Sequence, residues 1–284
     1  MRSSTHAILP WPEPGTEPLD SDGVQRLTSE AFERLRQQSP RIHCLTNAVA
    51  QEFTANVLLA AGAVPSMSVA ADEIAHFVRR AGAVLVNLGT LDAERRASAP
   101  LAVDAAETGS VPLVLDPVLV DASPPRLAVA RDIMRRRPSV IRLNAAEFEA
   151  LAGVAPSVRS VIDFARSAGA AVALTGAADL VSDGKSVLAI RNGNPWMTQV
   201  TAMGCAAGAL IAAFLAASAG PVMASVAGLA TLGVAGEMAG EKAQGPGSFA
   251  VVLPDALASL DASQLAERMR VDILPREAGA EAAS

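Results

Sequence analysis

The chain has 284 residues, a formal net charge of −6, 51% hydrophobic residues and 18% charged residues. Its length allows one large α/β domain or two small ones, and its hydrophobic content is enough for a sizeable core. Because there is no concentrated basic face, we expect no nucleic-acid partner. Two cysteines are too few for a disulfide framework and fit the reducing cytoplasm, where we expect the protein to be located.

Two segments raise the question of targeting or membrane insertion. Residues 1–22 contain several prolines and lack the apolar core of a signal peptide, so we expect a disordered leader. No Asp, Glu, Lys or Arg occurs between Arg191 and Glu237, a run long enough to cross a bilayer. This run is rich in Ala and Gly, is divided by Gly220-Pro221 and has no flanking Lys/Arg cluster. We therefore expect two buried helices, with a subunit interface as one place for them to pack, and no membrane partner.

The first two thirds of the chain alternate between apolar strands and helices. We expect strands at 41–47, 63–67, 83–89, 111–116, 139–144 and 170–176, and helices at 23–38, 53–61 (closed by Gly62), 72–80, 92–108, 126–136 and 146–168. This alternation predicts an α/β fold with a mostly parallel central sheet that helices flank on both faces. Ligands bind beyond the carboxyl ends of such strands, so these side chains should share one rim: Asn87, Asp116, Arg142, Asn144 and Thr175.

The last third has a different pattern. Asp183-Gly184 and Asn192-Gly193 lie between short apolar runs and predict hairpins, so a small antiparallel edge should finish the sheet. A helix begins near Cys205, a last strand is expected at 245–253, and a final helix is expected at 255–269. Because no internal repeat or linker is visible, we expect a single domain over residues 23–275 and a flexible tail over 276–284.

Residues 200–210 carry the first candidate site. A short turn, Thr201 to Gly204, runs into a segment of Ala, Gly, Leu and Val, and small residues at a helix start let an anion approach unpaired N–H groups. Cys205 lies in the first turn, where the helix N-terminus would lower the pKa of its thiol. The alternative is a buried cysteine that packs as a small hydrophobe. The residues alone leave both readings open.

Charged residues at the strand ends are candidates for metal and phosphate chemistry. A carboxylate such as Asp116 can hold hydrated Mg²⁺, although an Asp before proline also starts turns. Asn144 and Glu147 fit a capping box, and the same geometry would let Glu147 reach a metal-bound water. The guanidinium of Arg142 suits phosphate oxygens, unless it only forms an ion pair with Asp116 or Glu147. Thr175-Gly176 adds a hydroxyl and an open backbone.

Several other kinds of site are excluded. The three histidines lack metal-ligand spacing, so zinc is not expected, and we assign Asp121 and Asp179 to solvated loops. Neither a P-loop nor a dinucleotide-binding glycine motif occurs after a strand. Acidic groups, an arginine and a helix N-terminus on one rim suit phosphoryl transfer, so the residues alone favour a kinase.

A series of short motifs makes the chain resemble the hydroxyethylthiazole kinase family. In order, they are His43-Cys-Leu-Thr-Asn47, the segment from Ala55 to Met67, Asn87-Leu-Gly-Thr-Leu91, Asp116-Pro-Val118, Asn144-Ala-Ala-Glu147, Thr175-Gly176, Asn192-Gly193, the segment from Thr201 to Cys205, and Gly245-Pro-Gly-Ser-Phe249. The resemblance implies a ribokinase-like fold. It also implies ATP-dependent phosphorylation of the hydroxyl of 4-methyl-5-(2-hydroxyethyl)thiazole, a step of thiamine biosynthesis.

The resemblance further implies a role for each matching residue. The thiazole would contact Met67, Asn47 and Ala202; ATP would contact Arg142 and Thr175; Asp116 and Glu147 would hold Mg²⁺ directly or through water. The anion hole would be formed by Ala202, Met203, Gly204 and Cys205. Cys205 would mark the catalytic position, where related ribokinase-like enzymes have an Asp base. The pocket would be shared between neighbours of a homotrimer.

The chain departs from the family's pattern near the expected site. The family usually has Thr-Gly-Thr-Gly-Cys where this chain has Thr201-Ala-Met-Gly-Cys205, and a glycine-rich loop where this chain has residues 119–125. Ala202 and Met203 can still offer N–H groups if their φ angles are negative. The departures leave open a kinase for another small alcohol, such as hydroxymethylpyrimidine, a repair dehydratase of the same fold, or a nucleotide-binding protein without activity.

Overall fold

A single nine-stranded sheet runs through the molecule. The structure, a computed structural model, describes residues 20–217 and 219–275. The strand order is β2-β1-β3-β4-β5-β6-β7-β8-β9; pairing is parallel from β2 to β6 and antiparallel from β6 to β9. The strands are β1 Arg41–Leu45, β2 Val64–Ser66, β3 Ala83–Asn87, β4 Leu113–Asp116, β5 Val140–Asn144, β6 Ala171–Thr175, β7 Asp179–Ser182, β8 Val187–Ile190 and β9 Val271–Leu274. The predicted parallel sheet with an antiparallel edge is confirmed.

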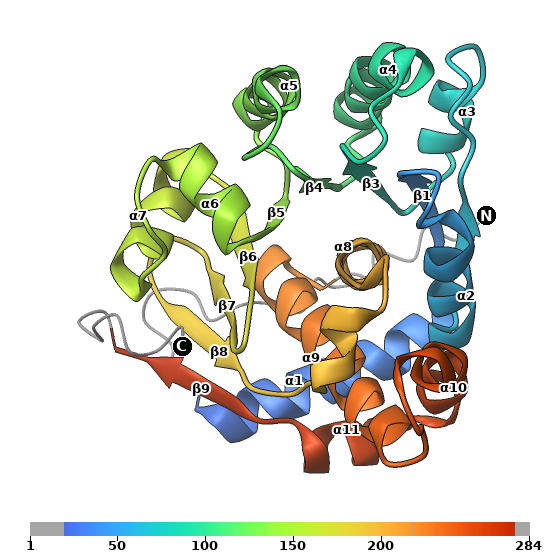
Figure 1. The fold of residues 1–284 in the computed structure, drawn as a ribbon, viewed down its shortest axis with the longest axis vertical. Coiled ribbons are helices and arrows are strands. Elements are labelled where there is room, and N and C mark those ends of the chain that lie inside the picture. Colours follow the sequence, from blue (N-terminus) through green and yellow to red (C-terminus); the bar gives the residue numbers. More distant parts are fainter. Residues whose placement is uncertain (1–19, 218, 276–284) are drawn as a thin grey trace, which may run out of the picture.

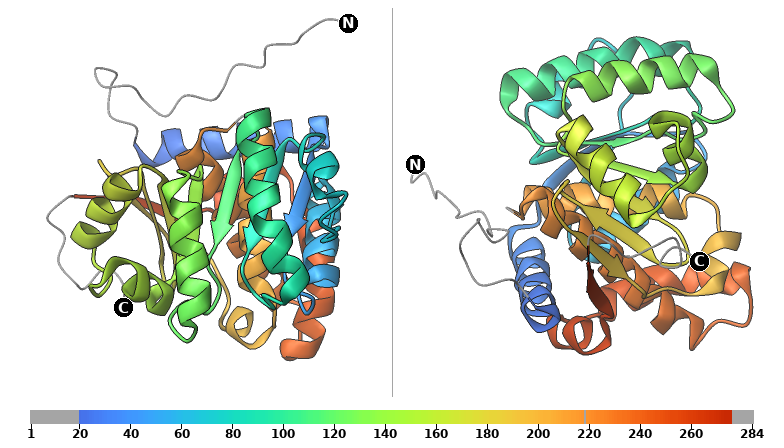
Figure 2. Two further views of the ribbon diagram at one scale, coloured as in Figure 1. Left: turned by 90° about the horizontal axis from the view of Figure 1, so that it is seen from above. Right: turned by 90° about the vertical axis from the view of Figure 1, so that its left-hand side faces the viewer.

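Helices cover both faces of the sheet (Figures 1 and 2). One layer, at the top of Figure 1, consists of α3 Ile74–Val78, α4 Ala93–Gly109, α5 Pro124–Arg135, α6 Ala145–Ala152 and α7 Val158–Ala168. The other consists of α1 Ser21–Gln38, α2 Gln51–Ala61, α8 Met203–Ala216, α9 Pro221–Gly240, α10 Pro246–Ser259 and α11 Ala262–Arg268. The central strands are therefore buried from both sides, which explains why they read as unbroken apolar runs.

The uncharged run after Arg191 forms α8 and α9, which pack against each other in the second layer. Helix α9 is long and apolar enough to cross a membrane, yet 94% of its most apolar window is buried inside the chain. Figure 1 shows both helices between the sheet and the outer helices α1 and α10. The expected buried helices are confirmed, and they are covered within one chain, without the subunit interface that we had allowed for.

Three predicted elements differ in the structure: the strand at 245–253, the helix at 146–168, and the helix at 255–269, which is divided between the end of α10 and α11. The strand expected at 245–253 is the first part of α10, because Pro246 starts a helix well and the buried Phe249, Leu253 and Leu257 repeat at helical spacing. The helix expected at 146–168 is two helices, since Gly153 ends α6 with a φ of 75°. Strand β9, which pairs with β8, was not expected from the sequence.

The expected leader is shorter than predicted. Helix α1 begins at Ser21, where the Asp20 side chain accepts a hydrogen bond from the backbone N–H of Gly23 at 2.8 Å. Two residues of the leader that we expected over 1–22 are therefore helical. Residues 1–19 and the tail expected over 276–284 lie outside the described residues.

Candidate functional site

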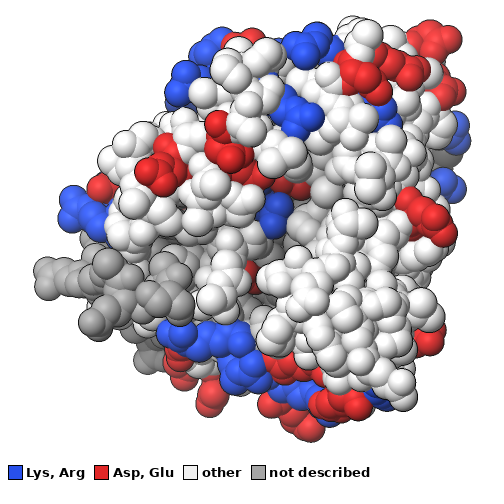
Figure 3. Space-filling model, viewed as in Figure 1, with Lys and Arg blue, Asp and Glu red and all other residues white. Residues whose placement is uncertain are grey.

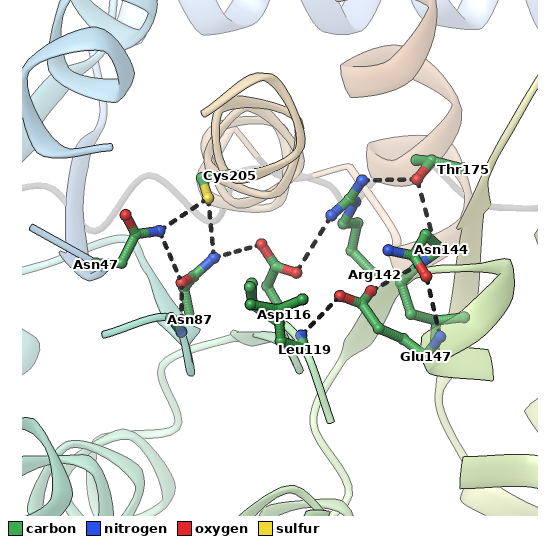
Figure 4. Close-up of polar contacts among 12 residues, drawn as sticks. Asn47, Asn87, Asp116, Leu119, Arg142, Asn144, Glu147, Thr175 and Cys205 are labelled. Atoms are coloured by element: carbon green, nitrogen blue, oxygen red, sulfur yellow. Dashed lines mark hydrogen bonds and ion pairs between the residues drawn. The ribbon is translucent and has the colours of Figure 1, made fainter. Parts of the chain in front are cut away.

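Polar side chains from five neighbouring elements meet at the carboxyl ends of the parallel strands (Figure 4). The sheet register aligns Asn87 of β3 with Asp116 of β4, and Asn144 of β5 with Thr175 of β6. Helix α8 starts above these strand ends and adds Cys205. The rim that the sequence predicted therefore exists, and it continues without a break from Asn47 to Thr175.

The Cys205 thiol lies in the first turn of α8 and accepts two amide hydrogen bonds. Asn47 Nδ2 lies 3.1 Å and Asn87 Nδ2 lies 3.2 Å from its sulfur. The side chain is buried at 8% exposure. Burial, and after it the charge of Asp116, raises the pKa of Cys205 to about 11, in spite of the two amides. The pKa of Cys205 is therefore raised and not lowered as the sequence predicted, and the loss of water on burial is the largest cause.

Asp116 is fully buried at the centre of the rim. One carboxylate oxygen lies 3.3 Å from Arg142 Nη1, and the other accepts a hydrogen bond from Asn87 Nδ2 at 2.5 Å. Burial nevertheless raises the pKa of Asp116 to about 6, because the attraction of Arg142 compensates only in part. The ionised carboxylate thus lacks sufficient positive charge nearby, as expected of a group that receives a cation when substrates bind.

Arg142 projects from the middle of β5 beneath the start of α8. Its Nη2 donates to Thr175 Oγ1 at 2.6 Å, and its Nη1 pairs with Asp116. Its Nε is buried and has no hydrogen-bond partner among the residues that the structure describes. A Cβ added to Gly204 would lie 2.5 Å from Nη1, so only glycine leaves room for the guanidinium against the helix backbone. The ion pair that the sequence allowed for is present, and binding of phosphate by Arg142 stays a prediction.

Glu147 is held by its own helix start. Its Oε2 accepts from the backbone N–H of Asn144 at 2.9 Å, and Asn144 Oδ1 accepts from the Glu147 N–H at 2.9 Å, which completes the predicted capping box. Its Oε1 accepts from the N–H of Leu119 at 3.0 Å, which links the loop after β4 to α6. Glu147 is only 2% exposed and faces Asp116 across the rim.

These two carboxylates fit magnesium better than a transition metal. Within residues 20–217 and 219–275, no group of three or more His, Cys, Asp or Glu side chains could hold a metal ion by itself. Mg²⁺ keeps several waters and binds through one or two carboxylates plus substrate phosphates. Asp116 and Glu147 supply two buried carboxylates, each with lone pairs beyond those already bonded.

The start of α8 has the exposed helix N–H groups on which the predicted anion site depends. The helix begins at Met203, so the N–H groups of its first turn have no acceptor within the helix. Figure 3 shows a hollow near the centre of this face, between charged surface at the upper left and a large uncharged area at the lower right. Ala202, however, has a φ of +69°, so the negative φ that we required of it is not found. The residue occupies the backbone conformation for which glycine is best suited.

This backbone conformation yields a prediction for Ala202→Gly. The left-handed region costs an alanine roughly 1–2 kcal/mol, and the greater freedom of glycine in the unfolded chain offsets only part of that cost. We expect the free energy of unfolding, measured in urea, to rise by about 1 kcal/mol. Ala97→Gly on the exposed side of α4 is the control, expected to lower it by about 1 kcal/mol. A loss of stability in Ala202→Gly would contradict the prediction.

Not every predicted residue joins the hydrogen-bonded set. Met67 follows the edge strand β2, is half-buried, and has a backbone carbonyl that accepts from Gln51 Nε2 at 3.4 Å. It lies next to β1, which leads into Asn47, but no hydrogen bond joins it to the residues around Cys205 in the described part of the chain. Its position at the outer end of the site is consistent with a pocket that another element completes.

Two residues of the site were missed by the sequence reasoning. Asn87 was placed on the rim without a role, although it hydrogen-bonds both Asp116 and Cys205. Asp179 was assigned to a solvated loop, but it begins β7, is half-buried, and accepts from the Gly176 N–H at 3.0 Å. Burial raises the pKa of Asp179 to about 6. In both cases the sequence signal was a polar residue at the end of a strand. This signal places the residue on the rim but does not show which groups it hydrogen-bonds.

Comparison with known proteins decides the family. The hydroxyethylthiazole kinase family profile matches residues 32–263. The chain belongs to the hydroxyethylthiazole kinase family. The chain is 42% identical over 267 residues to hydroxyethylthiazole kinase of Granulibacter bethesdensis, covering 89% of this chain and 97% of the relative. Both the family expected from the motifs and the ribokinase-like fold are confirmed.

Solved structures agree with this family membership. Hydroxyethylthiazole kinase protein from Pyrococcus horikoshii has a TM-score of 0.84 at 36% identity, covering 88% of this chain and all of that one. A ribokinase-like superfamily protein from Enterococcus faecalis has a TM-score of 0.62 at 12% identity, covering 82% of this chain and 93% of that one, and shows the fold alone.

Proposed function

We propose that this kinase transfers the γ-phosphoryl group of ATP to the hydroxyl of 4-methyl-5-(2-hydroxyethyl)thiazole, as a step of thiamine biosynthesis. The observation that carries the proposal is the family match over residues 32–263, which includes every residue of the rim from Asn47 to Cys205. The rim itself supports phosphoryl transfer, because it combines buried carboxylates, a buried arginine and the start of a helix.

Each side of the rim has its own task in this proposal. Arg142 and Thr175 bind the ATP phosphates, using the guanidinium donor that has no partner within the described residues. The N–H groups of Met203, Gly204 and Cys205 form the anion hole for the transferred phosphoryl group, whereas Ala202, with a φ of +69°, does not meet the condition set for its own N–H. Asn47, Met67 and Ala202 line the thiazole end, which places the hydroxyl near Cys205.

Charge neutralisation is divided between the protein and the metal. Asp116 and Glu147 would hold Mg²⁺, directly or through water, and the ion would offset the negative charge of the phosphates. Arg142 supplies the fixed positive charge, and its ion pair with Asp116 keeps the guanidinium oriented. Because the pKa of Cys205 is raised to about 11, its thiol remains protonated near neutral pH and can orient the hydroxyl by hydrogen bonding. A loose phosphoryl transition state needs little prior deprotonation of the alcohol.

A coupled ADP-release assay with hydroxyethylthiazole and Mg·ATP tests this function. Turnover that depends on the thiazole alcohol supports the proposal. Binding of ATP without turnover would instead indicate a nucleotide-binding protein that has lost its activity. The assay should use the full chain, with the ATPase rate in the absence of any alcohol as its baseline.

A second candidate is a kinase for another small alcohol, and specific residues favour testing it. Ala202 replaces a usual glycine and Met203 a usual threonine at the anion hole, and Leu119, with a φ of 57°, stands beside Asp116 where the family usually has a glycine-rich loop. These side chains narrow the space available to the acceptor. Hydroxymethylpyrimidine in the same assay separates the two candidates by their kcat/KM values.

We also propose a homotrimer in which the thiazole pocket lies between subunits. The uncharged area in Figure 3 lies where Figure 1 shows α2 and α10, and Val49, Leu59 and Val251 expose 70%, 57% and 72% of their surface around these helices. Met67, at the outer end of the site, fits a pocket completed by a neighbour.

Light scattering tests the trimer. We expect a molar mass near three times that of the chain for the parent, and a smaller mass for Leu59→Glu combined with Val251→Glu, because charges would be buried at the interface. Val154→Glu, at an equally exposed position after α6, is the control and should leave the mass unchanged. A monomeric parent would refute this assembly.

A cytoplasmic location completes the proposal. Both cysteines are free thiols, and α9, the helix that is long and apolar enough to cross a membrane, is part of the core. ATP and a reducing environment are both found in the cytoplasm, where these features fit.

A further inference from the structure

Asn87 is the most completely bonded side chain of the site. Its Nδ2 donates to Asp116 Oδ2 at 2.5 Å and to Cys205 Sγ at 3.2 Å. Its Oδ1 accepts from the Gly89 N–H at 3.0 Å and from Asn47 Nδ2 at 3.3 Å. An amide has two donor hydrogens and two acceptor lone pairs, so this buried group uses its full capacity. Such a saturated network fixes the orientation of the amide.

The backbone around Asn87 is shaped to fit the network. A Cβ on Gly89 would lie 2.7 Å from Asn47 Cβ, 2.9 Å from Asn47 Nδ2 and 3.0 Å from Asn87 Oδ1. Glycine is therefore required two residues after Asn87, so that the two amides can approach each other. Asn47 is anchored separately, because its Oδ1 accepts from the Ala50 N–H at 2.9 Å.

Among the described residues, Asn87 is the side chain that hydrogen-bonds to both halves of the site, at Cys205 and at Asp116. Cys205 and Asn47 belong to the acceptor end, while Asp116 pairs with Arg142 at the phosphate end. The two hydrogens of one amide nitrogen reach the sulfur and the carboxylate from a single rigid group (Figure 4). In-line phosphoryl transfer depends on the relative placement of the acceptor hydroxyl and the phosphates, and small displacements are costly.

We propose that Asn87 is a positioning residue that sets the distance and orientation between the Cys205 thiol and the Asp116 carboxylate. The proposal rests on the kinase function proposed above and assigns a role to a residue outside the substrate contacts. Because Asn87 acts through two partners, removing it should lower the rate of the bound complex more than the binding of ATP, which Arg142 and Thr175 hold.

Asn87→Leu tests this role, since leucine has a similar shape but no hydrogen-bonding groups. We expect kcat to fall about 10- to 100-fold, as for other residues that orient active-site ligands, with KM for ATP within about threefold of the parent. Asn87→Asp keeps an acceptor for the Gly89 N–H but loses both donor hydrogens, so its kcat should be no higher than that of Asn87→Leu. Asn192→Leu is the matched control: Asn192 is 8% exposed and bonds Glu237 and the chain around Arg268, away from Cys205, so kcat should be unchanged.

A double-mutant cycle with Cys205→Ala separates positioning from simple loss of structure. The fall in kcat caused by Asn87→Leu should be at least about threefold smaller in the Cys205→Ala protein, because one of the two partners is already absent. An equal fall in both backgrounds, or a rise in KM for ATP with kcat unchanged, would overturn the proposal.

The same double-mutant cycle can be measured by thermal unfolding, which requires neither bound ligand nor enzymatic turnover. The shifts in Tm caused by Asn87→Leu and Cys205→Ala should be non-additive, and additive shifts would overturn the link between the two side chains. A parent that shows no turnover with the thiazole alcohol, but non-additive Tm shifts, would refute the kinase function and leave the Asn87 link supported. The two failures are therefore distinguishable.

Discussion

Replacing Asp116 by asparagine should lower kcat/KM about 1,000-fold without destabilising the protein. The loss follows from removing the carboxylate that we propose holds Mg²⁺ and that is the partner of Arg142. An amide at this position also cannot accept from both Arg142 and Asn87, because one of its two polar atoms is a donor.

The stability of Asp116→Asn should be at least that of the parent at pH 7.5. The pKa of Asp116 is raised by burial to about 6 from the ordinary 3.8, so the ionised form costs the folded state roughly 3 kcal/mol. Asparagine avoids this cost, although the lost hydrogen bond to Arg142 offsets part of the gain. The expected result is a folded, stable and inactive protein.

The pH dependence provides the check on this explanation. A carboxyl whose pKa is raised in the folded state binds more protons there than in the unfolded chain between about pH 4 and 6, so the parent gains stability as the pH falls through 6. Any difference in the free energy of unfolding in favour of Asp116→Asn should shrink over this range. Comparing the two proteins cancels the titration of His43 and Asp179. A difference that does not change with pH, or an active Asp116→Asn enzyme, would contradict the argument.

The rim could be predicted from the sequence because each of its residues is marked by a pattern within a few neighbouring positions. A buried parallel strand must be apolar along its length, so a polar residue such as Asn87, Asp116 or Thr175 marks the point where it ends. The capping box of Asn144 and Glu147 is likewise decided within four residues. Local patterns predicted where these residues lie but not what they bind. The predicted substrate contacts came from the resemblance to the family.

The errors concern properties that depend on distant neighbours. The pKa of Cys205 is governed by burial between α8 and the strands, which the helix start alone does not reveal. Asp179 was judged exposed because its partner Gly176 lies across a turn whose shape depends on the pairing of β6 and β7. In the same way, the apolar run at 245–253 suits a strand or a buried helix equally, and packing of Phe249 and Leu253 in the core decides for the helix.

Gly204→Ala should reduce kcat/KM for ATP about 100-fold, although it adds only one methyl group. The new Cβ would lie 2.5 and 2.7 Å from the two terminal nitrogens of Arg142, so the guanidinium must leave its place beside Asp116 and Thr175. A displacement of this size in a phosphate-binding group costs on the order of 100-fold in rate, and overpacking should lower stability by about 1–3 kcal/mol.

Gly208→Ala, one turn further along α8, is the matched control for Gly204→Ala. Its Cβ would meet the flexible end of Leu85 at 3.2 Å and stay 3.7 Å from Asp116, while alanine improves helix propensity by up to about 1 kcal/mol. We expect steady-state kinetics within about threefold of the parent. If Gly204→Ala kept the parental kcat/KM for ATP, the place of Arg142 beneath α8 would not be needed for nucleotide binding. If both variants lost activity equally, the cause would be the helix as a whole and not the guanidinium.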